Sequence, residues 1–261
     1  MIPLKDENPT PPGFKPKMTI GLIATNAIIF FVQVAITGQF FDFEMVDAGG
    51  IHVNTISMYY NWGAVPNCIT GASTSIINFG GGPVSLSCPE VSYISLLTST
   101  FMHGGLLHFG GNMLFLWVFG DNIEHKFGKL KFLLIYLGWG IIAGLIHVMG
   151  DPTSPIPAVG ASGAISGVLG AYLIIFPRAR ILTLMGYFMM HVQARWFLPF
   201  WFVLQNLLPF FIGGFGASSG GVAFLAHIGG FLVGLATGYL YKKTNRSDFM
   251  YGTRYGYRPD Y

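Results

Sequence analysis

The sequence predicts an all-α polytopic membrane protein, a bundle of six transmembrane helices with its N- and C-termini in the cytoplasm. The chain has 261 residues, of which 52% are hydrophobic and only 10% are charged. A soluble domain of this length usually carries about a quarter charged residues. Long stretches without Lys or Arg separate the basic residues, and apolar runs fill these stretches. We therefore expect a helical bundle that contacts lipid.

Six runs are apolar enough for helices that cross a bilayer, which takes about 20 residues each. They cover residues 18–38, 104–122, 130–149, 161–176, 196–215 and 222–241, of which the fourth is short. The apolar stretch 181–194 is bracketed by Arg180 and Arg195. Because it is too short to span the bilayer, we expect it to lie at the membrane interface.

The basic residues predict the direction of these spans through the positive-inside rule. With the N-terminus in the cytoplasm, all 14 Lys and Arg residues fall on the cytoplasmic side. This orientation divides the chain into a cytoplasmic segment 1–17, a six-span core 18–243 and a cytoplasmic tail 244–261. Within the core, residues 39–99 form a long outer loop. We expect short interfacial helices there, and either a disulfide or two free thiols at Cys68 and Cys88.

Two polar residues in the spans suggest a catalytic site, since polar side chains are costly in lipid. Ser162 lies where a loop enters the fourth span, in the sequence Gly-Ala-Ser-Gly. By itself it could instead bond its own backbone or let helices approach each other. His227 lies early in the sixth span, in Ala-His-Ile-Gly-Gly. A packing histidine or a proton relay is the competing interpretation of this residue.

Small residues and depth connect the two positions. Both spans carry a stripe of small residues, with Gly163, Gly167 and Ala171 in one and Gly230, Gly234 and Gly238 in the other. Such stripes allow two helix backbones to approach closely, which would bring His227 within reach of Ser162. His108 also lies early in a span of the same direction, so the three side chains share one depth. We interpret Ser162 as a nucleophile and His227 as its general base.

His108 and Asn112 are separated by four residues and share one face of the second span. Hydrogen bonding between helices would explain the pair. The alternative is an oxyanion hole, which requires donors aimed at the tetrahedral oxygen. The Asn112 amide, a His108 ring nitrogen and the backbone N–H of Ser162 near a helix N-terminus could supply these donors.

Taken together, these motifs resemble the rhomboid family of intramembrane serine proteases over about residues 18–243. The matching elements are His103-x4-His108-x3-Asn112, the Gly-Ala-Ser-Gly and Ala-His-Ile-Gly-Gly sequences, and Glu124-x3-Gly128. The resemblance implies a Ser–His dyad without an acidic third member. It also implies cleavage of single-span membrane proteins near the outer face of the lipid bilayer, most simply the cell membrane. No cofactor, metal or nucleic acid is expected.

Two departures from the family pattern are visible. The first outer loop contains no Arg, so it lacks the Trp-Arg pair of many members. Some members also place a Tyr against the histidine, one helical turn after the serine, where this chain has Ser166. The residue that packs against His227 is therefore expected to differ from the Tyr of those members.

The fifth span is rich in aromatic residues and contains Gln205 and Asn206, which we interpret first as interhelical hydrogen-bonding groups. In rhomboids this span is thought to edge the substrate entrance. We predict that it gates lateral access and that the glycine-rich loop 213–221 caps the site.

Other functions fit less well. A catalytically inactive rhomboid-like protein that binds membrane clients usually lacks the serine or the histidine, and both are present here. A transporter or channel could also use membrane His and Asn residues, but it predicts internal repeats, and none is visible. A zinc protease would need His-Glu-x-x-His, which the sequence lacks. An aspartyl protease would need two buried Asp residues within spans, but apart from Asp121 at the inner end of the second span, no Asp falls within one.

Overall fold

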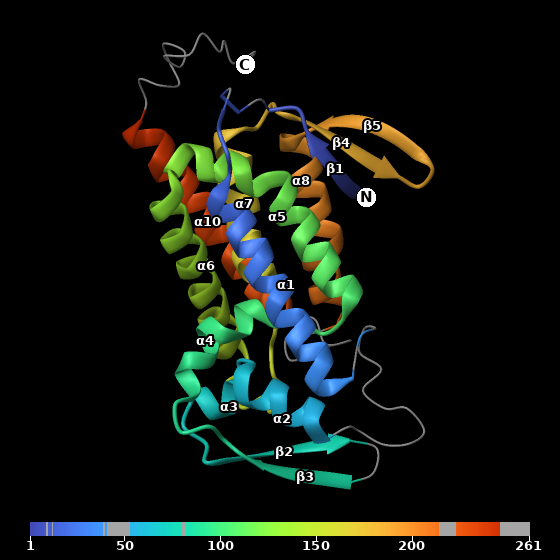
Figure 1. Cartoon of the computed structure of the whole chain (residues 1–261), viewed down its shortest axis with the longest axis vertical. Helices are drawn as coiled ribbons and strands as arrows, with labels where there is room; N and C mark the ends of the chain where they lie inside the picture. Colours follow the sequence, from blue (N-terminus) through green and yellow to red (C-terminus); the bar gives the residue numbers. More distant parts are fainter. Residues whose placement is uncertain are drawn as a thin grey trace.

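Long helices that run side by side dominate the computed structural model of the protein (Figure 1). It describes residues 1–245 except for 9, 12, 39, 41–52, 80–81 and 214–222. The long helices are α1 (Lys17–Thr37), α5 (Leu106–Phe127), α6 (Lys129–Gly150), α7 (Ser162–Ile175) and α10 (Phe224–Thr244). Each coincides with a predicted span to within a few residues. The shortest, α7, packs against α5, α6, α8 and α10 and is almost entirely buried.

The predicted fifth span is a helical run in three parts. It consists of α8 (Ala194–Phe202), a π turn η3 (Val203–Leu207) and α9 (Leu208–Gly213). Within the described residues, α1, α6 and α10 are long and apolar enough to cross a membrane, judged by length and composition. These helices indicate an integral membrane protein. The number of six spans and the side on which the termini lie stay predictions.

A small sheet at one end of the helices makes the all-α expectation too narrow. The strands β1 (Ile2–Asp6), β4 (Arg180–Met185) and β5 (Phe188–Gln193) form an antiparallel sheet in the order β1-β4-β5 (Figure 1). Ile181 and Thr183 are buried and alternate with more exposed residues, which is the period of a strand with one covered face. The segment 181–194 is therefore a hairpin, paired with the N-terminal strand.

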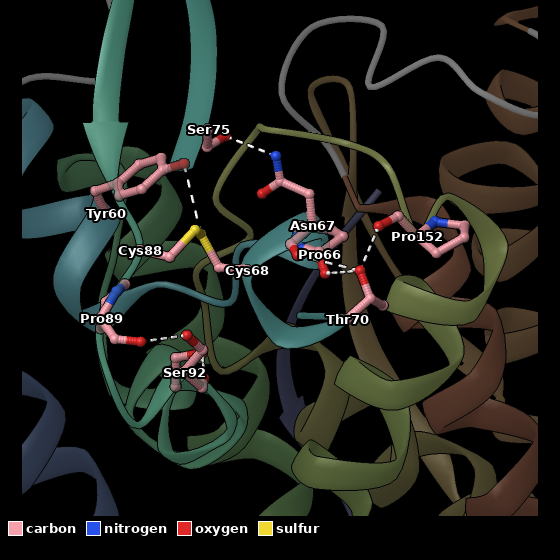
Figure 2. Close-up of a disulfide and its surroundings, with 11 residues drawn as sticks. Tyr60, Pro66, Asn67, Cys68, Thr70, Ser75, Cys88, Pro89, Ser92 and Pro152 are labelled. Atoms are coloured by element: carbon pink, nitrogen blue, oxygen red, sulfur yellow. Dashed lines mark hydrogen bonds between the residues drawn. A yellow bond between two sulfur atoms is a disulfide. The ribbon is translucent and has the colours of Figure 1, made fainter. Parts of the chain in front are cut away.

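The predicted outer loop folds at the opposite end of the bundle (Figure 1). Its elements are α2 (Val53–Trp62), α3 (Pro66–Ile69), the hairpin β2 (Thr74–Phe79) and β3 (Gly82–Ser87), and the short turns η1 (Ser92–Ile94), α4 (Ser95–Thr98) and η2 (Ser99–Phe101). A disulfide joins Cys68 and Cys88 (Figure 2), so of the two alternatives, a disulfide or two free thiols, the structure has the disulfide. The Thr70 hydroxyl donates to the Pro152 carbonyl oxygen at 2.9 Å, which connects the loop to the segment before α7.

A buried carboxylate joins the start of α1 to the end of α5. Glu124 accepts hydrogen bonds from the backbone N–H of Met18 at 3.0 Å, the N–H of Thr19 at 2.8 Å and the Thr19 hydroxyl at 2.8 Å. The first N–H groups of a helix have no partner within the helix, and a carboxylate there also complements the helix dipole. Gly128 then separates α5 from α6 with a φ of +78°, which favours glycine. The Glu-x3-Gly element thus has a structural explanation.

The predicted close approach of the two small-residue stripes is confirmed. A Cβ on Gly230 would overlap the carbonyl oxygen of Gly163, and one on Gly234 would overlap that of Gly167. Only glycine allows the backbones of α7 and α10 to lie this close. The small-residue seam, which we define as the contact of α7 with α10 at Gly163, Gly167, Gly230 and Gly234, sets the positions of Ser162 and His227.

Candidate active site

Ser162 and His227 come together at the N-terminal ends of α7 and α10. Ser162 is the first residue of α7, and His227 lies in the first turn of α10. The Ser162 Oγ lies 2.6 Å from the His227 Nε2, which is hydrogen-bonding distance. Chemically, this arrangement allows the imidazole to take the hydroxyl proton as the oxygen attacks an electrophile.

The loop before α7 needs a glycine at residue 160. Gly160 has a φ of +129°, a conformation that side chains with a Cβ rarely adopt. A Cβ at this position would also lie 2.7 Å from the His108 Nε2 and 3.4 Å from the Ser162 Oγ. The backbone N–H of Gly160 donates to the Ser99 carbonyl oxygen at 2.9 Å, which fixes the loop. His108 and Ser162 therefore both border Gly160.

His108 presents its Nε2 to this region, while its Nδ1 faces the backbone of the preceding turn. Its Nδ1 accepts a hydrogen bond from the backbone N–H of Gly104 at 3.3 Å. A neutral imidazole that accepts at Nδ1 carries its proton on Nε2, the nitrogen that faces Gly160. The ring can thus act as a donor on the side where Ser162 lies.

Asn112 lies one turn further along α5 and is 8% exposed. Its Nδ2 has no hydrogen-bond partner in the part of the chain that the structure describes. Buried polar groups are normally paired, so such a donor calls for an explanation. The backbone N–H of Ser162 starts a helix and has no intrahelical acceptor either.

Two residues that the sequence did not single out, Gln33 and Tyr59, hold the His103–His108 turn. Gln33 of α1 donates from its Nε2 to the His103 carbonyl oxygen, and its Oε1 accepts from the His103 N–H at 3.2 Å. The Tyr59 hydroxyl of α2 donates to the same carbonyl oxygen at 3.0 Å. The His103 ring meets the His108 ring edge to face, with centroids 5.2 Å apart. A glutamine in a mostly apolar span was the available signal in the sequence.

Asn206 and Gln205 differ in position. Asn206 is 1% exposed, and its Oδ1 lies 2.6 Å from the His227 Nδ1. Gln205 is exposed on the outside of the same π turn. The interhelical hydrogen bond expected for this pair therefore applies to Asn206, and its partner is the candidate base.

Almost all of the predicted capping loop, 213–221, lies outside the described residues. Within the described ranges, no group of three His, Cys, Asp or Glu side chains is arranged to hold a metal ion.

Similar proteins were found by comparison of the sequence. The family model of the Rhomboid domain matches residues 90–244. The Bacillus subtilis protein "Rhomboid protease GluP" is 39% identical over 110 residues, which is 41% of this chain and 21% of that protein. "Rhomboid protein 1, mitochondrial" of Saccharomyces cerevisiae is 30% identical over 156 residues, 58% of this chain and 43% of that protein.

The human "Presenilin-associated rhomboid-like protein, mitochondrial" is 34% identical over 110 residues, 41% of this chain and 28% of that protein. The chain thus matches less than half the length of these curated relatives. The family model covers more than half of this chain, and it includes the loop before α7 and the helices α5, α7 and α10, which carry Ser162, His227, His108 and Asn112. On this basis the chain belongs to the rhomboid family.

Proposed function

We propose that this protein is an intramembrane serine endopeptidase in which Ser162 is the nucleophile and His227 the general base. The observation that carries the proposal is the 2.6 Å separation of the Ser162 Oγ and the His227 Nε2. A serine hydroxyl is a weak nucleophile without an adjacent base, and such a pair performs acyl transfer in unrelated folds.

The proposed reaction begins with attack of the Ser162 Oγ on a peptide carbonyl carbon while His227 accepts the hydroxyl proton. The tetrahedral oxyanion then needs donors on the same side. We assign this role to the Asn112 Nδ2, the His108 Nε2 and the backbone N–H of Ser162. The buried amide nitrogen of Asn112, which has no partner in the described chain, supports this assignment, as does the Gly104 N–H contact to the His108 Nδ1, which leaves the Nε2 as the donor of a neutral ring. His227 returns its proton to the leaving amine, and water completes hydrolysis.

The proposed substrates are the transmembrane segments of single-span membrane proteins. The rhomboid family acts on membrane proteins within the bilayer, and the relative GluP is named as a rhomboid protease. We further propose that the multi-pass chain lies in the cell membrane with both termini in the cytoplasm, and that substrates pass beside α8, η3 and α9. Two of the relatives are named as mitochondrial proteins.

The experiment compares purified native protein with Ser162→Ala and His227→Ala. A fluorophosphonate probe should label native protein and fail to label Ser162→Ala, because the probe reacts with an activated serine. Both variants should lose nearly all cleavage of a single-span substrate in liposomes while keeping the thermal unfolding temperature.

Ser166→Ala is the matched control, since it removes a buried hydroxyl one turn further along α7. It should still be labelled. Substantial cleavage by Ser162→Ala would overturn the proposal. Native protein that binds membrane proteins but is neither labelled nor active would indicate a client-binding protein instead.

A further inference from the structure

The His227 ring makes two short contacts, one from each nitrogen. Its Nε2 lies 2.6 Å from the Ser162 Oγ, and its Nδ1 lies 2.6 Å from the Asn206 Oδ1. An amide oxygen can only accept a hydrogen bond, so the Nδ1 must carry the proton. The neutral ring then has its lone pair on Nε2, which is the form that can accept the proton of Ser162.

We infer that Asn206 is a positioning residue that holds His227 in the orientation and tautomer required of a general base. This inference rests on the proposed function of the Ser162–His227 pair. It replaces a two-residue site by the linear arrangement Ser162–His227–Asn206, in which the third member is a neutral amide. A residue that orients the base is the usual third part of such sites, and asparagine serves in this place in papain-like cysteine proteases.

The packing around Asn206 aligns it with the histidine. Phe202 of α8 stacks on Phe231 of α10, with ring centroids 4.1 Å apart and an interplanar angle of 17°. Asn206 follows Phe202 by four residues, and His227 precedes Phe231 by four. The stack and the hydrogen bond are thus one helical turn apart on both helices, as expected for an antiparallel pair. The aromatic stack therefore sets the register that places the amide against the ring.

Local backbone geometry and burial also single out Asn206. It lies in the π turn Val203–Leu207, and π turns within helices are rare and frequent at functional sites. Its side chain is 1% exposed, and its Nδ2 has no hydrogen-bond partner among the described residues. A buried amide with an unpaired nitrogen costs stability, which the single short bond to His227 offsets only in part. Selection for helix packing alone would favour an apolar residue here.

The test measures cleavage of a single-span substrate in liposomes by three variants. Asn206→Leu keeps the side-chain size but removes the acceptor, so His227 is no longer held in one tautomer. We expect kcat to fall on the order of 10²-fold, within the range that proton transfer by a positioned base contributes, while KM stays close to native. Asn206→Asp keeps an oxygen acceptor and should recover most of the lost kcat. Asn26→Leu makes the same change at a buried amide of α1, whose Nδ2 donates to the Leu22 carbonyl oxygen of its own helix, and should leave kcat unchanged.

Nitrogen-15 NMR of histidine-labelled protein supplies a readout that a purely structural role would not change. The native His227 signal should show a proton on Nδ1, and Asn206→Leu should shift it toward a mixture of tautomers. Full kcat for Asn206→Leu in a protein that Ser162→Ala inactivates would overturn this inference and leave the proposed function intact. Equal losses of kcat in Asn206→Leu and Asn206→Asp would also overturn it. Activity of Ser162→Ala would instead remove the proposed function itself.

Discussion

At the scale of single residues, the unpaired amide of Asn112 is the feature that separates a catalytic from a structural role. A buried donor without a partner costs roughly 1–3 kcal/mol. Because the Asn112 Nδ2 has no partner in the described chain, its removal should cost little stability. We predict that Asn112→Ala lowers kcat for a membrane substrate on the order of 10²–10³-fold, the usual effect of losing one oxyanion donor.

The predicted loss falls on kcat because this donor engages the transition state more than the bound substrate. Steady-state kinetics in liposomes and thermal unfolding in detergent measure the two quantities on one preparation. An intact kcat together with a lowered unfolding temperature would show that Asn112 serves helix packing.

At the scale of helices, the small-residue seam holds α7 against α10. A Cβ on Gly234 would overlap the carbonyl oxygen of Gly167, so an alanine there must push the two backbones apart. We predict that Gly234→Ala destabilises the protein by about 1–3 kcal/mol, the typical cost of overpacking. It should also reduce cleavage, because Ser162 and His227 are carried by these two helices. Thermal unfolding and turnover, measured together, check both effects.

Gly138→Ala is the matched control for the seam. Gly138 lies within α6, and nothing lies within 4 Å of a Cβ built on it. Alanine favours a helix over glycine by about 1 kcal/mol, so this variant should be as stable as native protein or slightly more stable. A Gly234→Ala variant that behaves like Gly138→Ala would contradict the seam as a determinant of the site.

At the scale of the whole molecule, Asp6 connects the N-terminal strand to two helices of the core. Its Oδ2 accepts hydrogen bonds from the Tyr172 hydroxyl of α7 at 2.6 Å and the Asn122 Nδ2 of α5 at 2.7 Å. Burial raises the pKa of Asp6 from 3.8 to about 7, and the nearby Asp121 adds to this, while the Tyr172 hydrogen bond and Lys5 act in the opposite direction. The folded protein therefore takes up a proton at Asp6 that the unfolded chain lacks between about pH 4 and pH 7.

The sign of the pH effect follows from this uptake. Since the folded state binds more protons than the unfolded state in that window, stability falls as the pH rises through it and levels off above about pH 7. We predict that native protein loses roughly 2–4 kcal/mol from this group over the window, whereas Asp6→Asn does not. Unfolding temperatures of native protein and Asp6→Asn, measured at about pH 4.5 and about pH 8, give the comparison. A pH dependence that is equal in both proteins would contradict a buried Asp6 carboxyl.

The pattern of residues along the chain was sufficient to locate the helices, the small-residue seam and the pair Ser162 and His227. These features depend on local properties, because about 20 apolar residues are needed to cross a bilayer and small residues at helical spacing allow close packing. The family motifs are likewise short and readable in sequence order. The rhomboid family is therefore recognisable from these motifs in the sequence.

The tertiary structure alone distinguished Asn206 from Gln205, paired the N-terminal strand with β4, joined Cys68 to Cys88 and placed Glu124 at the start of α1. Each of these depends on contacts between segments that are distant in sequence. Two adjacent amides look the same in an apolar run, and the rotation of the helix about its axis decides which one is buried. That rotation is set by the stacking of Phe202 on Phe231 and by the π turn, which no local pattern in the sequence encodes.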